Sequence, residues 1–236
     1  MNIKRLCIAH RGSHNDEIPE NSMMAFRKSL SRNLPIEFDI HLLKDNNIVV
    51  FHDDDLYRMT GVNKKLRDCT YNEIKNLKLK NTNEKIPLLK DVLKLVDGKV
   101  LLDIELKEDH DGNNLEIELI KILKNYNGEF ILKSFNYKAV KYLMKNTNYT
   151  VGLLYPDLDS PKLKLSPLKK MIIRNINFNI ILKPHFLAIS KKAINDKCIK
   201  NYKGPVLVWT IKTDAEKERF LKLADTVIFE DEKKTI

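Results

Sequence analysis

Short apolar runs alternate with segments of helical periodicity along the whole chain, and this alternation most constrains the fold. Runs of strand length are expected at residues 6–9, 36–42, 100–106, 130–133, 151–154, 180–182, 206–209 and 227–229. Strands separated by helices form parallel sheets, and about eight such units can close on themselves. We therefore predict an α/β fold, a TIM-type (β/α)8 barrel. An open doubly wound sheet is the alternative, but the Gly-rich phosphate loop typical of that fold is missing from the sequence.

The length and composition fit one globular domain. The chain has 236 residues, of which 43% are hydrophobic, so it can bury a sizeable core. We expect residues 1–236 to form a single domain, with a short helical insertion at 53–99 between the second and third barrel strands. No apolar run approaches the roughly 20 residues that span a bilayer, and the three cysteines lack metal-ligand spacing. These features favour a cytoplasmic protein with reduced thiols.

The positive charge is concentrated in one region. The formal net charge is +10, yet residues 1–61 hold 8 Lys and Arg against 9 Asp and Glu, whereas residues 161–203 hold 11 against Asp196 alone. Lysines on solvated outer helix faces would explain this bias. Attraction to an anionic substrate, or peripheral contact with an anionic membrane through 161–203, would also explain it. Nucleic acid is disfavoured as a partner because no nucleic-acid-binding motif is present and aromatic residues are not interleaved with the basic ones.

Two strands carry charged side chains with a spacing of two residues. Glu37 and Asp39 leave the same face of their strand, and Glu105 and Lys107 repeat this geometry,. These side chains could lie on a solvated face, or Glu105 could form a local ion pair with Lys107. If the two strands are neighbours, however, the carboxylates converge, and two like charges about 4 Å apart cost roughly 4 kcal/mol at an effective dielectric of about 20. Such a cluster must protonate or bind a cation, and an all-oxygen ligand set favours Mg²⁺ or Ca²⁺ over zinc.

Cationic and imidazole side chains are predicted at strand ends near these acids. Arg11 and Lys107 are suited to phosphate oxygens. His10 and His52 are residues that can exchange protons near neutral pH, and in a barrel the chemistry belongs at the carboxyl ends of the strands. The pattern therefore predicts a metal site flanked by two proton-transfer groups and two phosphate-binding cations.

Over nearly its whole length, and in order, the chain resembles the glycerophosphodiester phosphodiesterase family. The matching residues are His10-Arg11-Gly12, Pro19-Glu20-Asn21, Glu37-x-Asp39, His52-Asp53, Arg58-x-Thr60-Gly61, Glu105-x-Lys107, Ser134-Phe135 and Trp209-Thr210. The resemblance implies a barrel enzyme that hydrolyses glycerophosphodiesters to glycerol 3-phosphate and an alcohol. It implies one divalent cation, Mg²⁺ or Ca²⁺, held by Glu37, Asp39 and Glu105, and acid–base catalysis by His10 and His52. The phosphate would be held by Arg11 and Lys107, and the pocket would be lined by Glu20, Asn21, Ser134, Phe135 and Trp209.

The sequence departs from the family pattern at three positions. Leu43, Asp103 and Lys212 stand where Thr, Asn and Asn are usual. None of these is a proposed ligand or catalytic histidine, although Asp103 could add a fourth carboxylate to the metal site. The insertion at 53–99 is short for the family, which suggests a modest cap over the site.

Three functional hypotheses follow from these features. In the first, a hydrolase of glycerophosphodiesters uses His52 as the acid and His10 as the base. In the second, the same site works as a lysophospholipase D-type phosphodiesterase on membrane lysophospholipids, with the basic 161–203 stretch at the membrane. In the third, the barrel is a non-catalytic anion-binding module.

Overall fold

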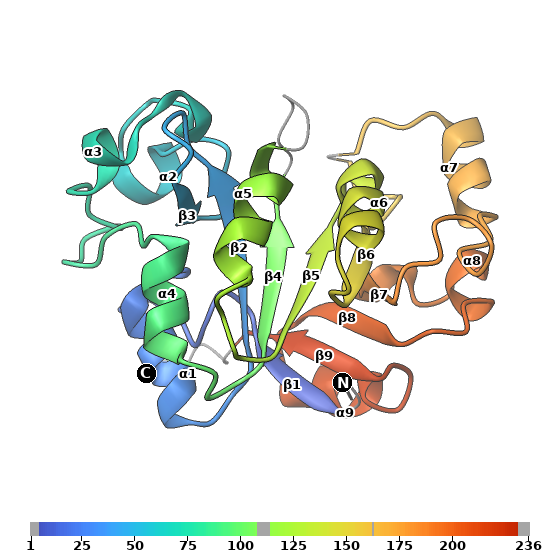
Figure 1. The fold of residues 1–236 in the computed structure, drawn as a ribbon. Helices are drawn as coiled ribbons and strands as arrows, with labels where there is room; N and C mark the ends of the chain where they lie inside the picture. Colours follow the sequence, from blue (N-terminus) through green and yellow to red (C-terminus); the bar gives the residue numbers. More distant parts are fainter. Residues whose placement is uncertain (1–4, 108–113, 162, 231–236) are drawn as a thin grey trace.

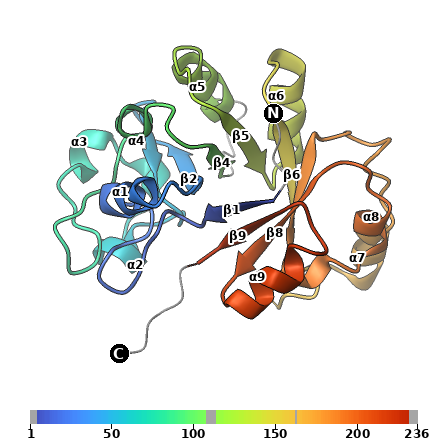
Figure 2. The same cartoon turned by 90° about the horizontal axis from the view of Figure 1, so that it is seen from below.

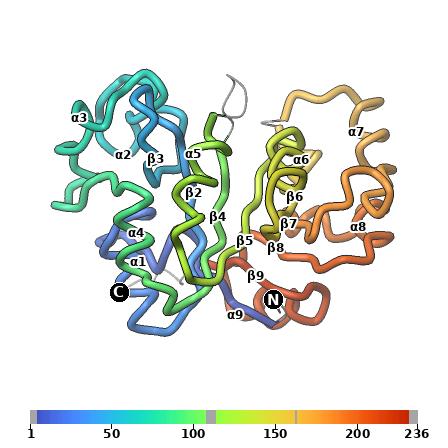
Figure 3. The backbone as a smooth tube through the Cα atoms, in the orientation of Figure 1, coloured from blue at the N-terminus to red at the C-terminus, as the bar shows by residue number. Residues whose placement is uncertain are grey.

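Eight parallel strands form a closed barrel in the computed structural model, which describes residues 5–107, 114–161 and 163–230. The barrel strands are β1 (Leu6–Ala9), β2 (Ile36–Leu42), β4 (Leu102–Leu106), β5 (Phe130–Ser134), β6 (Val151–Tyr155), β7 (Phe186–Ser190), β8 (Val206–Ile211) and β9 (Thr226–Phe229). The barrel closes where β1 pairs with β2 on one side and with β9 on the other. Figure 3 shows this juxtaposition of the first and last strands of the chain. The expected (β/α)8 barrel is confirmed.

The strand sequences explain which side chains face inward. Apolar residues at every second position of β1, β5 and β9 (Ile8, Ile131 and Ile228) pack together inside the barrel. The alternate residues of β2 (Ile36, Phe38 and Ile40) instead pack outward, in the larger core that the helices cover. Since successive side chains in a strand point to opposite faces, the inward positions continue past the apolar interior into polar residues at the carboxyl ends.

Helices surround the barrel (Figure 1, Figure 2). The longer ones are α1 (Met23–Ser31), α4 (Leu89–Val96), α5 (Asn114–Leu123), α6 (Tyr137–Asn146), α7 (Pro167–Arg174) and α9 (Asp214–Phe220), and α8 (Lys197–Lys200) is short. The first begins where the Ser22 hydroxyl accepts a hydrogen bond from the backbone of Ala25, an N-cap that satisfies one otherwise unpaired backbone donor. None of the helices in the described ranges is long and apolar enough to cross a membrane.

One expected strand is misplaced in the sequence prediction. Residues 180–182 are not a strand, and the seventh barrel strand is instead β7, whose five residues are all buried. Leu182 and Lys183 have positive φ angles of 64° and 50°, a left-handed conformation incompatible with an extended strand. The apolar run at 180–182 therefore belongs to a turn before β7.

Two segments extend from the barrel at the carboxyl ends of its strands. The first follows β3 (Ile48–Val50), which pairs antiparallel with β2 outside the barrel, and contains α2 (Tyr57–Thr60), the 3₁₀ helix η1 (Leu66–Asp68) and α3 (Tyr71–Ile74). Together with α4, these short elements occupy the 53–99 range of the expected insertion. The second follows β6 and contains α7. Figure 1 shows α2 and α3 on one side of the barrel and α7 on the other.

Candidate active site

Three buried carboxylates converge at the carboxyl ends of β2 and β4. The two strands are neighbours, and their register places Asp39 beside Glu105 and Glu37 beside Asp103. The side chains of Glu37, Asp39 and Glu105 each offer one oxygen, and these three atoms lie within 4.8 Å of one another. The exposed fractions of the three residues are only 2%, 1% and 7%. The strands thus bring together the three predicted metal ligands.

Two cations border this group. The Lys107 Nζ atom lies 3.0 Å from Asp39 Oδ1 and 2.7 Å from Glu105 Oε1. The Arg11 Nε atom lies 3.5 Å from Asp39 Oδ2, and the backbone N–H of Arg11 donates a hydrogen bond to Glu37 Oε2 at 3.0 Å. Burial alone would raise the pKa of Asp39, but Lys107 and Arg11 outweigh it and hold that pKa well below its usual range. Asp39 is therefore a carboxylate, as a cation ligand must be.

Asp103 is bound to a different partner. The Lys133 Nζ atom lies 2.7 Å from Asp103 Oδ2 and 3.1 Å from Glu37 Oε1, and both residues of this pair are fully buried. Burial, partly offset by Lys133, raises the pKa of Asp103 to about 7. The short contact with Nζ makes Asp103 the nearest acidic partner of Lys133. The other oxygen of Asp103, Oδ1, is buried without a hydrogen-bond partner among the described residues, but Asp103 is not part of the group of three carboxylates whose oxygens lie within 4.8 Å of one another. Its role as a fourth carboxylate stays a prediction.

The residues present fit a hard divalent cation. The converging donor atoms are carboxylate oxygens, which Mg²⁺ and Ca²⁺ prefer. Asn21, whose amide Nδ2 donates to Asp39 Oδ2 at 2.9 Å, has its Oδ1 buried without a hydrogen-bond partner among the described residues. A buried oxygen without a partner is costly, and here it lies on a residue that also contacts the carboxylate group. The site therefore has the composition of an all-oxygen cation site.

Each predicted catalytic histidine has a carboxylate behind it. His10 Nδ1 lies 3.0 Å from Glu230 Oε1, and His52 Nδ1 lies 2.7 Å from Asp53 Oδ1. A carboxylate that accepts a hydrogen bond from Nδ1–H fixes the ring orientation and the tautomer. The Nε2 atom of each ring is then left for the cavity that His10 and His52 both line.

A chain of ion pairs connects the second histidine to the first loop. Arg58 lies between Asp53 and Glu20, contacting both, and Arg11 Nη1 reaches Glu20 Oε1 at 2.7 Å. Burial would raise the pKa of Glu20, but hydrogen bonds and charge from Arg58 and Arg11 lower it to about 2. Glu20 therefore fixes two arginines in place. It lines neither of the two cavities described next.

Two adjoining cavities lie at the active site, and both are lined by Glu105 and Lys107. The inner one, of about 110 Å³, is lined by both histidines, Arg11 and Lys107. The outer cleft, of about 700 Å³, shares His52, Lys107 and Trp209 with the inner cavity. Phe135 and Trp209 form one wall of both cavities, with their rings edge to face at 6.0 Å between centroids. Among the predicted pocket residues, these two face the cavities.

The other predicted pocket residues lie outside these cavities. The Ser134 hydroxyl donates to the Leu106 carbonyl at 2.8 Å, so it joins neighbouring strands. Asn21 contacts Asp39 from the side of the loop that follows β1. Both residues thus support the site from outside.

Sequence reasoning missed Lys133 and Glu230. The signal was the period of two residues along each strand, because Lys133 follows the inward-facing Ile131 and Glu230 follows the inward-facing Ile228. The same rule that gave Glu37 and Asp39, applied to β5 and β9, places both charges at the carboxyl ends.

Comparisons with known proteins agree with this geometry. The sequence pattern of the Glycerophosphoryl diester phosphodiesterase family matches residues 10–235. A protein of Caldanaerobacter subterraneus subsp. tengcongensis named Glycerophosphodiester phosphodiesterase is 32% identical over 99% of this chain and 97% of its own. The human protein Lysophospholipase D GDPD1 is 26% identical over 95% of this chain and 82% of its own.

Solved structures show the same fold. A phosphodiesterase from Oleispira antarctica, determined in complex with the product sn-glycerol-3-phosphate, has a TM-score of 0.78 at 21% identity and covers 96% of this chain and 93% of its own. The glycerophosphodiester phosphodiesterase of Thermotoga maritima has a TM-score of 0.71 at 25% identity and covers 95% and 94% of the two chains. With a family match over almost the entire length and a relative of this identity, the resemblance inferred from the motifs is confirmed: the chain belongs to the glycerophosphoryl diester phosphodiesterase family, whose members are phosphoric diester hydrolases.

Proposed function

We propose that the enzyme hydrolyses glycerophosphodiesters to glycerol 3-phosphate and an alcohol, using one divalent cation, Mg²⁺ or Ca²⁺. The observation that carries this proposal is the convergence of Glu37, Asp39 and Glu105, whose oxygens lie within 4.8 Å of one another. Glu37 and Glu105 line the inner cavity together with the two imidazoles. Residues 1–236 would act as one catalytic domain, with 53–99 as its helical insertion.

The cation would be held by these three carboxylates. A cation held there would supply Lewis-acid stabilisation of negative charge on the non-bridging phosphate oxygens. Arg11 and Lys107 line the same inner cavity, and their cationic groups would bind the phosphate and fix its orientation.

The cavities suggest how the two histidines divide the proton transfers. His10 lines the inner cavity, whereas His52 lines both the inner cavity and the outer cleft. The departing alcohol needs space, and the outer cleft provides it. We therefore assign the acid role to His52, whose Nε2–H would give its proton to the leaving alkoxide. His10 would act as the base that takes a proton from the nucleophile. If the nucleophile is water, glycerol 3-phosphate forms directly; if it is the neighbouring hydroxyl of the glycerol, a cyclic phosphodiester forms first and water then opens it to glycerol 3-phosphate.

A lysophospholipase D-type activity is the second candidate. A human relative carries that name, and the outer cleft of about 700 Å³ leaves room for a leaving group beyond the inner cavity. Choline release from lysophosphatidylcholine would identify this activity, whereas glycerol 3-phosphate release from glycerophosphocholine identifies the first.

Metal removal tests the proposal directly. We expect dialysis against EDTA to abolish glycerol 3-phosphate release, and Mg²⁺ or Ca²⁺ to restore it. A Glu37→Gln, Asp39→Asn double variant should lose both turnover and calorimetric binding of the ion while keeping a cooperative thermal transition. Full turnover in the EDTA-treated enzyme would refute the metal site. Retained anion binding by a His10→Ala, His52→Ala variant, with no wild-type turnover on any diester, would instead indicate a non-catalytic module.

A further inference from the structure

Helix α7 presents an apolar face to solvent. Leu168, Met171 and Ile172 are 62%, 56% and 55% exposed. Their spacing of three and four residues places them on one side of the helix. None of the eight residues of α7, all of them described by the structure, is buried, while Ile173 packs partly against the core from the opposite side. Helix α7 is therefore packed against the protein on one side and exposes apolar side chains on the other.

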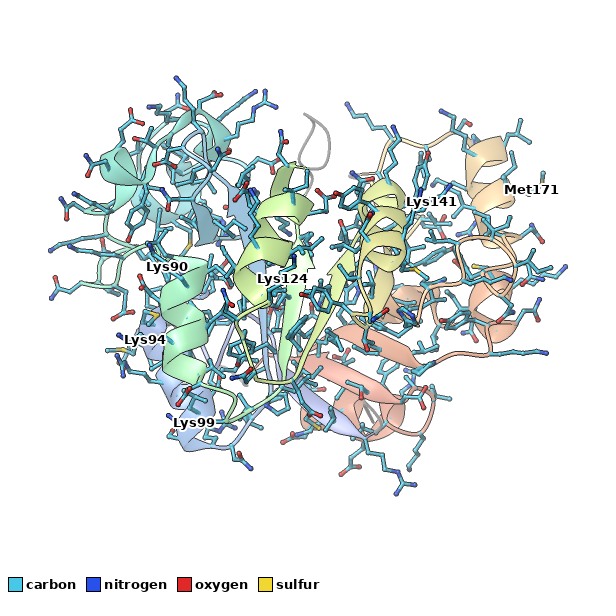
Figure 4. The ribbon with its side chains drawn as sticks, in the orientation of Figure 1. Lys90, Lys94, Lys99, Lys124, Lys141 and Met171 are labelled. Carbon is cyan, nitrogen blue, oxygen red and sulfur yellow. The ribbon has the colours of Figure 1, made fainter. Side chains whose placement is uncertain are left out.

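This face carries three large exposed apolar side chains, whereas α1, α5 and α6 each carry a single one, Met24, Ile117 and Tyr137. Exposed lysines lie on or beside three of the outer helices, Lys90 on α4, Lys141 on α6 and Lys124 directly after α5, whereas Met171 projects from the outer edge of α7 (Figure 4). More exposed apolar side chains follow α7 in the chain: Ile180 and Ile181, in the turn before β7, are 69% and 57% exposed. Large exposed apolar side chains of this kind mark protein or membrane contacts.

The charges of the segment decide between these partners. Residues 163–183 contain five Lys and Arg and no acid, while Lys162 lies outside the described residues. Lys170 and Arg174 pair with Asp159. Lys164, Lys169 and Lys183 are exposed and form no ion pair with another described residue. An exposed apolar face rimmed by unpaired lysines is typical of a helix that lies in the interface of an anionic bilayer.

The location of the segment links this face to the site. Pro156, Asp157, Ser160 and Leu163, which lead into α7, line the outer cleft. We propose that segment 163–183 docks the enzyme on anionic lipid surfaces, with Leu168, Met171 and Ile172 inserted between headgroups and the lysines beside them. The mouth of the cleft is then held near the bilayer, where lipid-derived diesters are concentrated. Leu168, Met171, Ile172 and the lysines beside them line neither cavity of the proposed catalytic site.

Vesicle binding tests the proposal. We expect the full chain to co-sediment with vesicles of equal parts phosphatidylcholine and phosphatidylglycerol, and to bind pure phosphatidylcholine vesicles much less. A Met171→Ser, Ile172→Ser variant should bind the anionic vesicles at least about tenfold more weakly, because two inserted side chains are lost. The matched control is Leu223→Ser, a residue 54% exposed between α9 and β9, which should leave binding unchanged.

A charge variant tests the electrostatic part separately. Lys169→Glu should weaken anionic vesicle binding by about tenfold at low salt and much less at high salt. Lys90→Glu, the same change on α4, should have little effect. Equal losses in these two variants would show that only overall charge matters and would overturn the assigned surface.

The remaining outcomes are equally decisive. Absence of wild-type binding to anionic vesicles overturns the proposal, as does unchanged binding by the Met171→Ser, Ile172→Ser variant. If sedimentation velocity shows a wild-type dimer that this variant abolishes, and vesicles are not bound, the face is an interface between two copies. Turnover of soluble glycerophosphocholine without vesicles should be the same in wild type and in the Met171→Ser, Ile172→Ser variant. If neither enzyme turned over this substrate while the wild type still bound vesicles, the result would count against the proposed function and not against the docking surface.

Discussion

The two segments that flank the active-site mouth are built in opposite ways. Residues 53–88 enclose a separate apolar cluster in which Leu66 and Ile74 are fully buried. In the segment between β6 and β7, helix α7 has its apolar face in solvent. The first segment has enough buried surface to hold a fixed conformation, and the second has apolar surface left for contact with something else.

Their charges differ in the same way. In the first segment, Asp53 and Arg58 are paired toward the barrel and reach His52 and Glu20. In the second, Lys170 and Arg174 pair with Asp159, which is 69% exposed, and Arg174 also contacts Asp196; neither acid lines the cavities of the active site. One segment therefore positions a group of the active site, whereas the other provides a wall of the cleft and an outer surface.

The largest difference should appear in turnover. Replacing His52, which Asp53 of the first segment positions, by Ala removes the proposed acid and should lower kcat by about 10²- to 10⁴-fold. Leu168→Ala, in the second segment, should leave kcat for soluble glycerophosphocholine unchanged. Steady-state kinetics on both variants makes the test, and a His52→Ala enzyme within a few-fold of wild type would remove His52 from the mechanism.

The next largest difference should appear in stability: the same Leu→Ala change should cost more unfolding free energy in the first segment than in the second. Leu66→Ala leaves a cavity in the cluster of the first segment and should reduce the free energy of unfolding by about 2–5 kcal/mol. Leu168→Ala removes the same atoms from an exposed site and should change it by less than about 0.5 kcal/mol. Urea denaturation of the two variants measures both values. Equal losses would mean that α7 is as well packed as the first segment.

The ion pairs of Glu20 with Arg58 and Arg11 predict that part of the free energy of unfolding depends on pH. The pKa of Glu20 is lowered to about 2 from 4.5, so its contribution is present above about pH 4.5 and is lost as the pH falls toward 2. A pKa shift of this size corresponds to a contribution of up to about 3 kcal/mol to the free energy of unfolding. The actual contribution should be smaller because Arg58 is partly exposed and solvent screens its charge.

Glu20→Gln isolates this contribution. Wild type should exceed the variant in unfolding free energy by a constant amount near neutral pH, and the gap should narrow steadily below about pH 4.5. Chemical denaturation at several pH values measures the gap. A gap that does not change with pH would show that the carboxylate charge is not what links Arg58 to the barrel.

The fold was predictable because its signals are local. Alternation of strands and helices requires no knowledge of distant contacts, and the period of two residues places Glu37 and Asp39 on one face without a structure. The run at 180–182 was misread because its apolar composition resembles a strand, whereas the positive φ angles of Leu182 and Lys183 have no clear sequence signal.

The supporting contacts of the site were harder to predict. The pairing of Arg58 with Glu20 joins residues 38 positions apart through two irregular loops, and no periodicity encodes it. Lys133 and Glu230 follow the strand period, but their strands are short, so the inward phase was visible only once the neighbouring strands fixed it. Sequence therefore revealed the reactive groups better than the residues that hold them.

The smallest expected effect concerns the outward pairs of the second segment. Lys170 Nζ lies 3.6 Å from Asp159 Oδ1 across a solvent-exposed gap, and exposed pairs of this kind contribute about 0–1 kcal/mol. Lys170→Ala should therefore leave both stability and soluble-substrate turnover near wild type. Arg58→Ala, in the first segment, should lower both because it leaves the half-buried Glu20 with one partner fewer. Thermal unfolding and kinetics on the two variants compare them directly. If Lys170→Ala were as damaging as Arg58→Ala, the second segment would have to be counted among the parts that hold the active site in place.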